Sequence, residues 1–191
     1  MLPWMVSRKN SASTVNPTKL HADIQLFAGI EGQEEARNAY PALREWTKTS
    51  AARQALWHAG QILRAATSMP KPLLCNFNAI ALYHAGLILW GYGFLRRSTM
   101  DSSYSAGTTQ LDVILNGNDP LPAKRFITSN RGIPSILSPT SQASIRISDV
   151  SAIMDTLIHV LQAHHGTSEG SCSPLVGNLV QLLVGLRSAT K

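Results

Sequence analysis

The sequence predicts an all-α fold, an irregular multi-helix domain arranged around a buried apolar central helix. Apolar residues recur at helical spacing in several separate segments, which is the pattern of helices that bury one side. The stretch of residues 73–95 contains no Asp, Glu, Lys or Arg, as expected of a helix surrounded by other helices. No stretch of useful length alternates between apolar and polar residues, so no strands are predicted.

The composition is typical of a globular protein. The chain has 191 residues, 44% of them apolar, enough for one domain with its own core. The formal net charge is +6, but the Lys and Arg residues are scattered, so a nucleic-acid partner is favoured only weakly. The two cysteines, Cys75 and Cys172, are too few for a disulfide framework and fit a reducing compartment. The N-terminus lacks the apolar run of a secretory signal.

Residues 1–30 are predicted to be an irregular lead-in, because single apolar residues are dispersed there among Ser, Asn, Pro and Lys. Residues 31–191 are predicted to form the helical domain. Its first helix is expected over residues 31–40, where three glutamates suit a helix N-terminus. Pro41 either breaks this helix or starts the next short turn.

The clearest helix is predicted over residues 50–68, with Ser50 as its N-cap. Its apolar residues follow the spacing of a single buried stripe, formed by Ala52, Ala55, Leu56, Ala59, Ile62, Leu63 and Ala66. Trp57 falls outside this stripe, on the side of Arg53 and Arg64. Either a loop or the lead-in covers Trp57, or the three residues form a partner-contact surface in which an anchoring Trp is flanked by arginines.

The central helix is predicted over residues 73–95. Its small residues Ala79, Gly86 and Gly93 are seven apart and share one side of the helix, which lets a neighbouring backbone approach closely. Bulky side chains occupy the opposite arc. We therefore expect neighbours on at least two sides of this helix.

Two other interpretations of the central stretch stay open. Its uncharged length exceeds the roughly 18 apolar residues that indicate a membrane span, which would make the chain a single-span membrane protein. Asn76, Asn78 and His84 argue against a span, because polar groups are costly in lipid without partners. The second alternative is a small helical enzyme or ligand carrier with a pocket near His84 and Tyr83. In the preferred interpretation, His84 and Tyr83 are buried polar residues of the core, and His84 is held by a hydrogen bond.

The second half of the chain is predicted to contain a polar linker at residues 98–107, one or two helical turns at residues 123–129, and two long helices. The first long helix begins at Ser148 as N-cap and ends near residue 165. The last begins with Ser173 as cap and Pro174 at the first helical position, an order that helices favour. Its buried face is predicted to consist of Leu175, Val176, Leu179, Leu182, Leu183 and Leu186.

No motif of enzyme chemistry is found in the sequence. The six histidines form no HExxH frame, and the cysteines lack zinc-finger spacing. No GxSxG elbow or GxxxxGK phosphate loop is present. The sequence therefore predicts a protein that is not an enzyme, with no catalytic, metal-binding or DNA-contacting residues and no cofactor. The pattern alone favours a helical interaction or regulatory domain.

Two passages together resemble one protein family. They are ARQALWHAGQILR at residues 52–64 and IALYHAGLILWGYG at residues 80–93. They resemble the C-terminal part of the fungal-specific transcription factor regulatory domain, in the branch associated with two-cysteine two-histidine zinc fingers. Shorter passages at residues 113–117, 131–134 and 174–179 are similar to that family's connector and closing helix.

The resemblance implies a regulatory segment of a nuclear fungal transcription factor that acts through protein partners or self-association and makes no membrane contact. Zinc would belong to a finger module that this sequence lacks, so DNA would be contacted only indirectly. The earlier half of the family's helical domain is also missing, so the domain at residues 31–191 is expected to be incomplete. A fragment, a truncated gene product and a regulator that acts through partners are all compatible with this pattern. The family has no catalytic residues to carry over.

Overall fold

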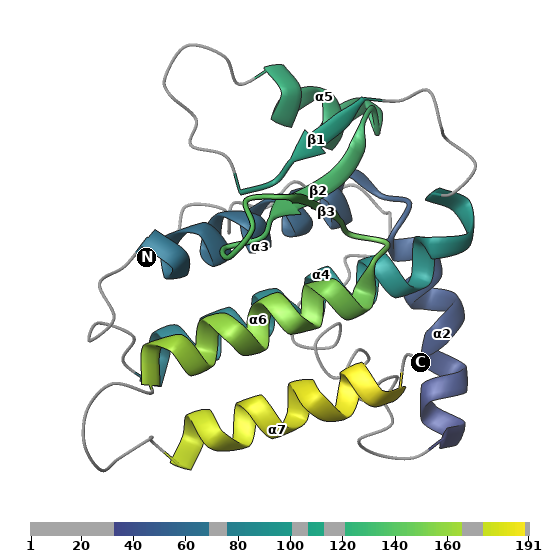
Figure 1. The fold of residues 1–191 in the computed structure, drawn as a ribbon. Helices are drawn as coiled ribbons and strands as arrows, with labels where there is room; N and C mark the ends of the chain where they lie inside the picture. Colours follow the sequence, from purple (N-terminus) through teal and green to yellow (C-terminus); the bar gives the residue numbers. More distant parts are fainter. Residues whose placement is uncertain (1–32, 69–75, 101–106, 113–120, 166–173, 190–191) are drawn as a thin grey trace.

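The structure, a computed structural model, describes residues 33–68, 76–100, 107–112, 121–165 and 174–189 (Figure 1). These ranges contain six helices and three strands. In chain order the elements are α2 (Gln33–Trp46), α3 (Ser50–Ser68), α4 (Asn76–Met100), β1 (Thr108–Gln110), α5 (Leu121–Ser129), β2 (Ile133–Leu137), β3 (Ser144–Arg146), α6 (Val150–His165) and α7 (Pro174–Ala189). The predicted lead-in at residues 1–30, both cysteines and the passage at residues 113–117 lie outside the described ranges.

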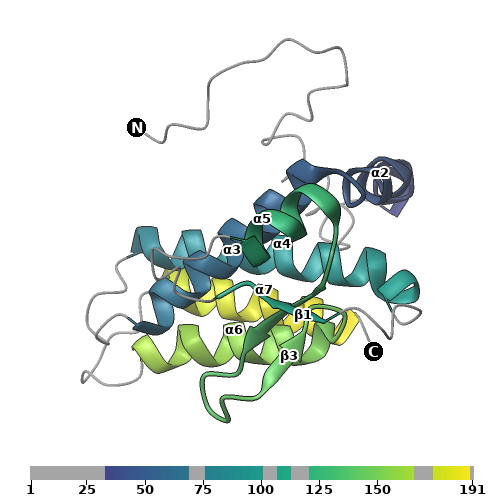
Figure 2. The ribbon, with the colours of Figure 1, turned by 90° about the horizontal axis from the view of Figure 1, so that it is seen from above.

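The helices are stacked in layers. Figure 1 shows α7 at one end of the stack, α6 and α4 next to it, then α3, with the strands and α5 at the other end. The view from above in Figure 2 shows α5 over α3 and the strands beside α6. The contacts between elements agree with this order, because α4 contacts α3, α6 and α7, while α5 contacts α3 and β1.

The prediction of a purely helical fold is wrong in one part, since β1, β2 and β3 form a small mixed sheet. β1 pairs with β2 in parallel, with Thr109 opposite Pro134, and β2 pairs with β3 in antiparallel register, with Ile136 opposite Ile145. Strands of three, five and three residues are too short to show an alternating pattern. Four successive residues of β2 are buried, and a strand that is buried on both faces has no need of alternating apolar and polar residues.

The prediction of a buried central helix is confirmed for the described part of the stretch. α4 contacts α2, α3, α6 and α7, and its side chains Leu82, Leu89 and Tyr92 are completely buried. The small residues do allow close approach. A methyl group added at Gly86 would lie 2.8 Å from Leu157 Cδ1 of α6, and one added at Gly93 would overlap the carbonyl oxygen of Ile147.

Helix α4 does not end where the sequence suggested. It continues to Met100, through the first residues of the predicted linker, because nothing in those residues forces the backbone to leave the helix. None of the helices in the described ranges is both long enough and apolar enough to cross a membrane.

Two predicted helix starts are shifted by one residue. The N-cap of α3 is Thr49, whose Oγ1 accepts a hydrogen bond from the Ala52 N–H at 3.1 Å. The N-cap of α6 is Asp149, whose Oδ1 accepts one from the Ala152 N–H at 3.1 Å. At both positions two adjacent residues have cap-forming side chains, and the sequence could not choose between them.

Helix α2 continues through Pro41 to Trp46, although a break or a new turn was predicted there. Ala39, Leu43 and Trp46 are all buried, on the same side of α2. Packing along this side offsets the backbone hydrogen bond that Pro41 cannot donate.

Candidate interaction surface

The predicted partner surface around Trp57 is not exposed. Trp57 belongs to the hydrophobic core with 7% of its surface accessible, and Arg53 has 6% accessible. Arg64 is half-buried. The interpretation in which other parts of the protein cover Trp57 fits this placement, and an exposed anchor flanked by arginines does not.

Arg53 connects α3 to α5 and to the turn after α2. Its Nε donates to the Ile127 carbonyl oxygen of α5 at 2.9 Å, and its Nη1 donates to the Lys48 carbonyl oxygen after α2 at 2.8 Å. Burial lowers the pKa of the Arg53 guanidinium below its usual value through desolvation, with Tyr92 opposing the shift and Arg96 adding to it. Arginine stays protonated in neutral water, so Arg53 acts as a charged donor that holds α5 onto α3.

Arg64, near the other end of α3, also donates a hydrogen bond that holds α3 to another segment. Its Nη1 donates to the Asp112 carbonyl oxygen at 2.8 Å, and Gln61 Nε2 donates to the Leu111 carbonyl oxygen at 2.7 Å. Asp112 in turn accepts a hydrogen bond from the Leu137 N–H through Oδ2 at 2.9 Å. These contacts join α3 to the residues after β1 and to β2. The structure therefore gives both candidate arginines roles inside the fold.

Tyr83 and His84 lie in the first half of α4. Tyr83 is buried, with 3% of its surface exposed, and His84 is half-buried. Their rings are tilted by 52° with centroids 5.8 Å apart. Both side chains interact with other groups of the protein, and these positions fit residues that are packed between helices.

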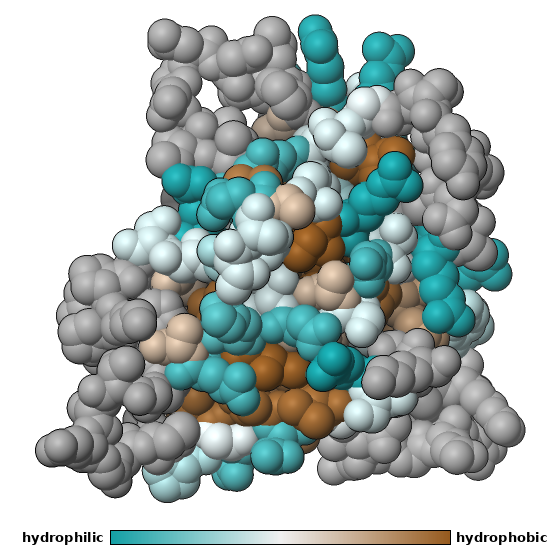
Figure 3. Space-filling model, in the orientation of Figure 1, coloured by the Kyte–Doolittle hydropathy of each residue, from teal (hydrophilic) through white to brown (hydrophobic). Residues whose placement is uncertain are grey.

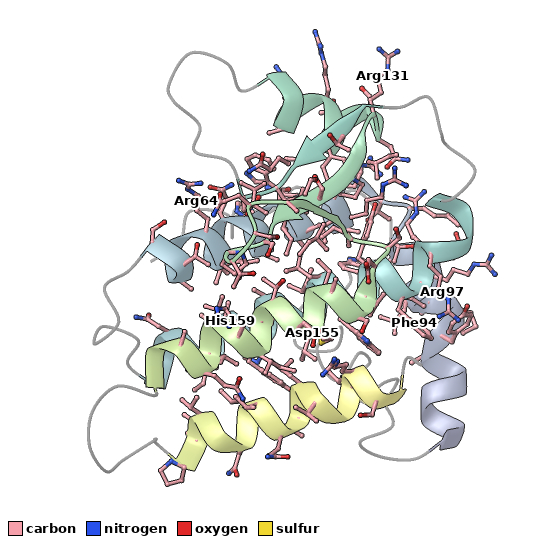
Figure 4. All side chains as sticks on the ribbon, viewed as in Figure 1. Arg64, Phe94, Arg97, Arg131, Asp155 and His159 are labelled. Carbon is pink, nitrogen blue, oxygen red and sulfur yellow. The ribbon has the colours of Figure 1, made fainter. Side chains whose placement is uncertain are left out.

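A shallow groove of about 320 Å³ lies between the β2–β3 turn and α6. Ser138, Asp155 and His159 are among its lining residues, and Figure 4 labels the last two on α6. The Ser138 hydroxyl lies 3.0 Å from that of Thr140, and Asp155 is paired with Arg187 of α7 at 3.0 Å. In the part of the chain that the structure describes, Ser138 has no hydrogen bond to a base. The groove has the volume of a small ligand site without the nucleophile–base pair of a catalytic one.

Helix α7 is apolar over an unusually wide arc. At the helical rotation of 100° per residue, its apolar side chains from Leu182 round to Val184 span about 200° of the circumference, about twice the stripe that a surface helix needs. The buried part of this arc consists of Val176, Leu179, Leu183 and Leu186. The main contacts of α7 are with α6 and α4, so they cover only part of the arc.

The remaining apolar side chains of α7 are accessible. Leu182 has 38% of its surface exposed and Val184 has 37%, while Leu175 and Val180 are half-buried. We call these four residues the α7 apolar flanks. Figure 3 shows a band of hydrophobic side chains along the α6 and α7 layer, bordered by hydrophilic ones. Contiguous apolar patches on a protein surface mark sites of contact with other proteins, so the α7 apolar flanks are the candidate surface.

Comparison of the chain with protein-family models, with curated proteins and with solved structures finds no match. The candidate surface therefore rests on geometry. The apolar spacing predicts Leu175 and Leu182 on the buried face of the last helix, and for the exposed Leu182 this prediction is wrong. The sequence offered no signal for this exposure, because helical spacing places an apolar side chain on an arc without showing how much of that arc other helices cover.

Proposed function

We propose that this chain is a regulatory, protein-interaction segment of a fungal transcription factor, acting in the nucleus, with the α7 apolar flanks as its contact surface. The observation that carries the interaction role is the exposure of Leu182 and Val184 on a helix with one charged residue. The fungal regulatory origin and the nuclear location rest on the resemblance of residues 52–64 and 80–93. The proposal involves no catalytic step and no cofactor.

The arrangement of the two resembling passages supports the proposal. Residues 52–64 belong to α3 and residues 80–93 to α4, and these two helices make the most extensive contact between elements in the described ranges. Passages inherited from one domain are expected to pack together. The close approach of α4 to its neighbours at Gly86 and Gly93 accounts for small residues within the second passage.

The chemistry of α7 indicates the kind of partner. Its single charged residue, Arg187, is already paired with Asp155, so the surface offers no free charge for a charged partner. An amphipathic helix that lays its apolar side along α7 would bury Leu182 or Val184. Such a helix would come from the rest of the regulator or from a separate regulatory protein.

A tethering experiment tests the proposal. The full chain is fused to a heterologous DNA-binding domain in a fungal reporter strain, and reporter expression and nuclear localisation are measured. We expect expression to change when the chain is tethered, and the change to be lost in the Leu182→Gln/Val184→Gln variant. Ile62→Gln is the matched control, because Ile62 on α3 is also apolar and 38% exposed, and we expect it to behave like the unchanged chain.

Circular dichroism of the purified variants shows whether helicity is retained, so that a lost response is not caused by unfolding. A tethered chain without effect on the reporter would contradict the regulatory role. An equal loss in the Ile62→Gln variant would contradict the assignment of the surface to α7. Recovery of the chain in a carbonate-washed membrane pellet would favour the single-span interpretation instead.

A further inference from the structure

Between residues 123 and 131, the exposed side chains of α5 and of the turn after it are all cationic, hydroxyl or amide groups. Lys124 and Arg125 are exposed on α5, and Arg131 is exposed two residues after its end. The intervening exposed residues are Thr128, Ser129 and Asn130. Figure 4 shows Arg131 projecting away from the body of the protein at the α5 end of the stack. We call residues 124–131, on this outward side, the α5 basic edge.

The three cations of this edge have no ion-pair partner among the side chains that the structure describes, whereas Lys48 is paired with Glu45 and Arg187 with Asp155. The other acidic side chains that the structure describes are also engaged. Asp112 accepts the Leu137 N–H, and Asp149 caps α6. The positive charge of the α5 basic edge is therefore available to an external anion.

The edge is held on a fixed support. Phe126 is completely buried and Ala123 has 6% of its surface exposed, so the inward side of α5 is anchored in the core. Arg53 adds the hydrogen bond to the Ile127 carbonyl oxygen. The Asn130 N–H donates to the Phe126 carbonyl oxygen at 3.1 Å, which fixes the turn that presents Arg131. Cations on a fixed support bind a regular array of charges with less loss of conformational entropy.

We propose that the α5 basic edge binds the phosphate backbone of duplex nucleic acid without reading its sequence. Lys, Arg, Ser, Thr and Asn are the side chains that contact phosphate oxygens in such complexes, and all five types are present on the edge. Single strands are recognised by stacking on accessible aromatic rings, and the aromatic residue of α5, Phe126, is buried. Protein partners are held by apolar anchors, and the exposed large apolar residues of the described ranges, Tyr40, Ile62, Leu182 and Val184, all lie on other helices.

This inference goes beyond the proposed function, which assigns the chain no nucleic-acid contact of its own. Fluorescence anisotropy of a short labelled DNA duplex, titrated with the full chain at several salt concentrations, tests it. Three phosphate contacts predict a slope of about −2.7 for log K against log salt concentration, which corresponds to an affinity loss of about 40-fold between 50 and 200 mM salt. The Arg131→Gln variant should lower the size of this slope by about 1.

A matched pair of double variants separates the α5 basic edge from general charge attraction. Each double variant removes two exposed positive charges: one is Lys124→Gln/Arg125→Gln on the edge, and the other is Arg97→Gln/Arg146→Gln elsewhere. We expect the variant on the edge to reduce the slope of log K against log salt concentration to about −0.9. We expect the other variant to have a slope near that of the unchanged chain. Thermal unfolding of each variant shows that these exposed substitutions leave the fold intact.

Equal loss of DNA binding in the two double variants would overturn the proposal, as would an absence of binding at low salt. Tighter binding of a labelled acidic peptide than of the duplex would overturn it in favour of a protein partner. The reporter response that tests the α7 apolar flanks is measured on a tethered chain and depends on different residues, so either proposal can fail without the other.

Discussion

Helices α4 and α7 both contain few charged residues, and they lie in different surroundings. The charged residues of α4 are Arg96 and Arg97 near its end, and that of α7 is Arg187. α4 is contacted by α2, α3, α6 and α7, whereas the main contacts of α7 are with α6 and α4. With similar apolar compositions, α4 is covered by other helices and α7 is partly accessible. Apolar composition alone therefore does not determine burial.

The glycines of the two helices show the same difference at atomic scale. A methyl group added at Gly93 of α4 would overlap the Ile147 carbonyl oxygen, while one added at Gly185 of α7 would meet nothing within 4 Å. On α4, glycine is required for close approach. On α7 it leaves open space, as expected on a side that no described element covers.

The largest expected effect is that of Gly93→Ala. The added carbon would force the backbone at Ile147 away from α4, and because a backbone atom cannot move aside as a flexible side chain does, we expect a loss of more than about 3 kcal/mol in the free energy of unfolding. Chemical denaturation measures this loss. A variant with stability close to that of the unchanged chain would show that α4 is not in tight contact with the segment before α6.

The substitution Leu183→Ala should have the next largest effect. Leu183 is completely buried on α7, and Leu→Ala substitutions in cores cost about 2 to 5 kcal/mol. We expect about 2 kcal/mol, because a helix at the end of the stack can shift to fill part of the cavity. The neighbouring Leu182→Ala is the control, and at 38% exposure it should change the free energy of unfolding by less than about 0.5 kcal/mol. Equal losses would show that Leu182 is covered as well.

A smaller effect, of opposite sign, is expected for Gly185→Ala. Alanine is favoured over glycine inside a helix by about 0.5 to 1 kcal/mol, and the added methyl group meets open space. The variant should therefore be more stable by roughly that amount in thermal or chemical unfolding. A loss of stability would show that another part of the protein lies against this side of α7, which would remove the contrast with α4.

The smallest effect is confined to alkaline pH. Burial raises the pKa of Tyr92 from 10.0, although Arg96, whose Nη1 donates to the Tyr92 hydroxyl at 3.2 Å, opposes the shift. Because the folded state holds this proton more tightly than the unfolded state, the contribution of Tyr92 to stability is fully present below pH 10 and is lost as the pH rises through the raised pKa. Tyr92→Phe should reduce the alkaline loss of stability, measured by unfolding between pH 9 and 12. Parallel stability curves for the variant and the unchanged chain would contradict the burial of the phenol.

The helices were largely predictable because their signals are local. The apolar spacing in residues 50–68, the missing charges in residues 73–95 and Pro174 at a first helical position each lie within a few turns of chain. The strands were not predictable, since β1 pairs with residues about 25 positions away, Thr108 with Ile133. No pattern within three residues can reveal such a pairing.

The candidate surfaces were predicted less well than the helices. Trp57 was assigned outside a single buried stripe, but α3 is contacted by α4, α5 and α6, and a helix with neighbours on several sides has no single stripe. Leu182 was assigned to a buried face for the converse reason, because α7 has fewer neighbours than its apolar arc could accommodate. In both cases the prediction was wrong because the sequence does not show which other segments pack against a side chain.

The sequence by itself determined where the helices form and that one uncharged segment is buried between others, because spacing, caps and missing charges act over a few residues of backbone. Only the tertiary structure decided that α4 is enclosed while α7 keeps accessible flanks, that three short strands pair, and that Lys124, Arg125 and Arg131 face outward together. These features depend on contacts between segments far apart in the chain, and each contact exists only when the whole set of layers is assembled.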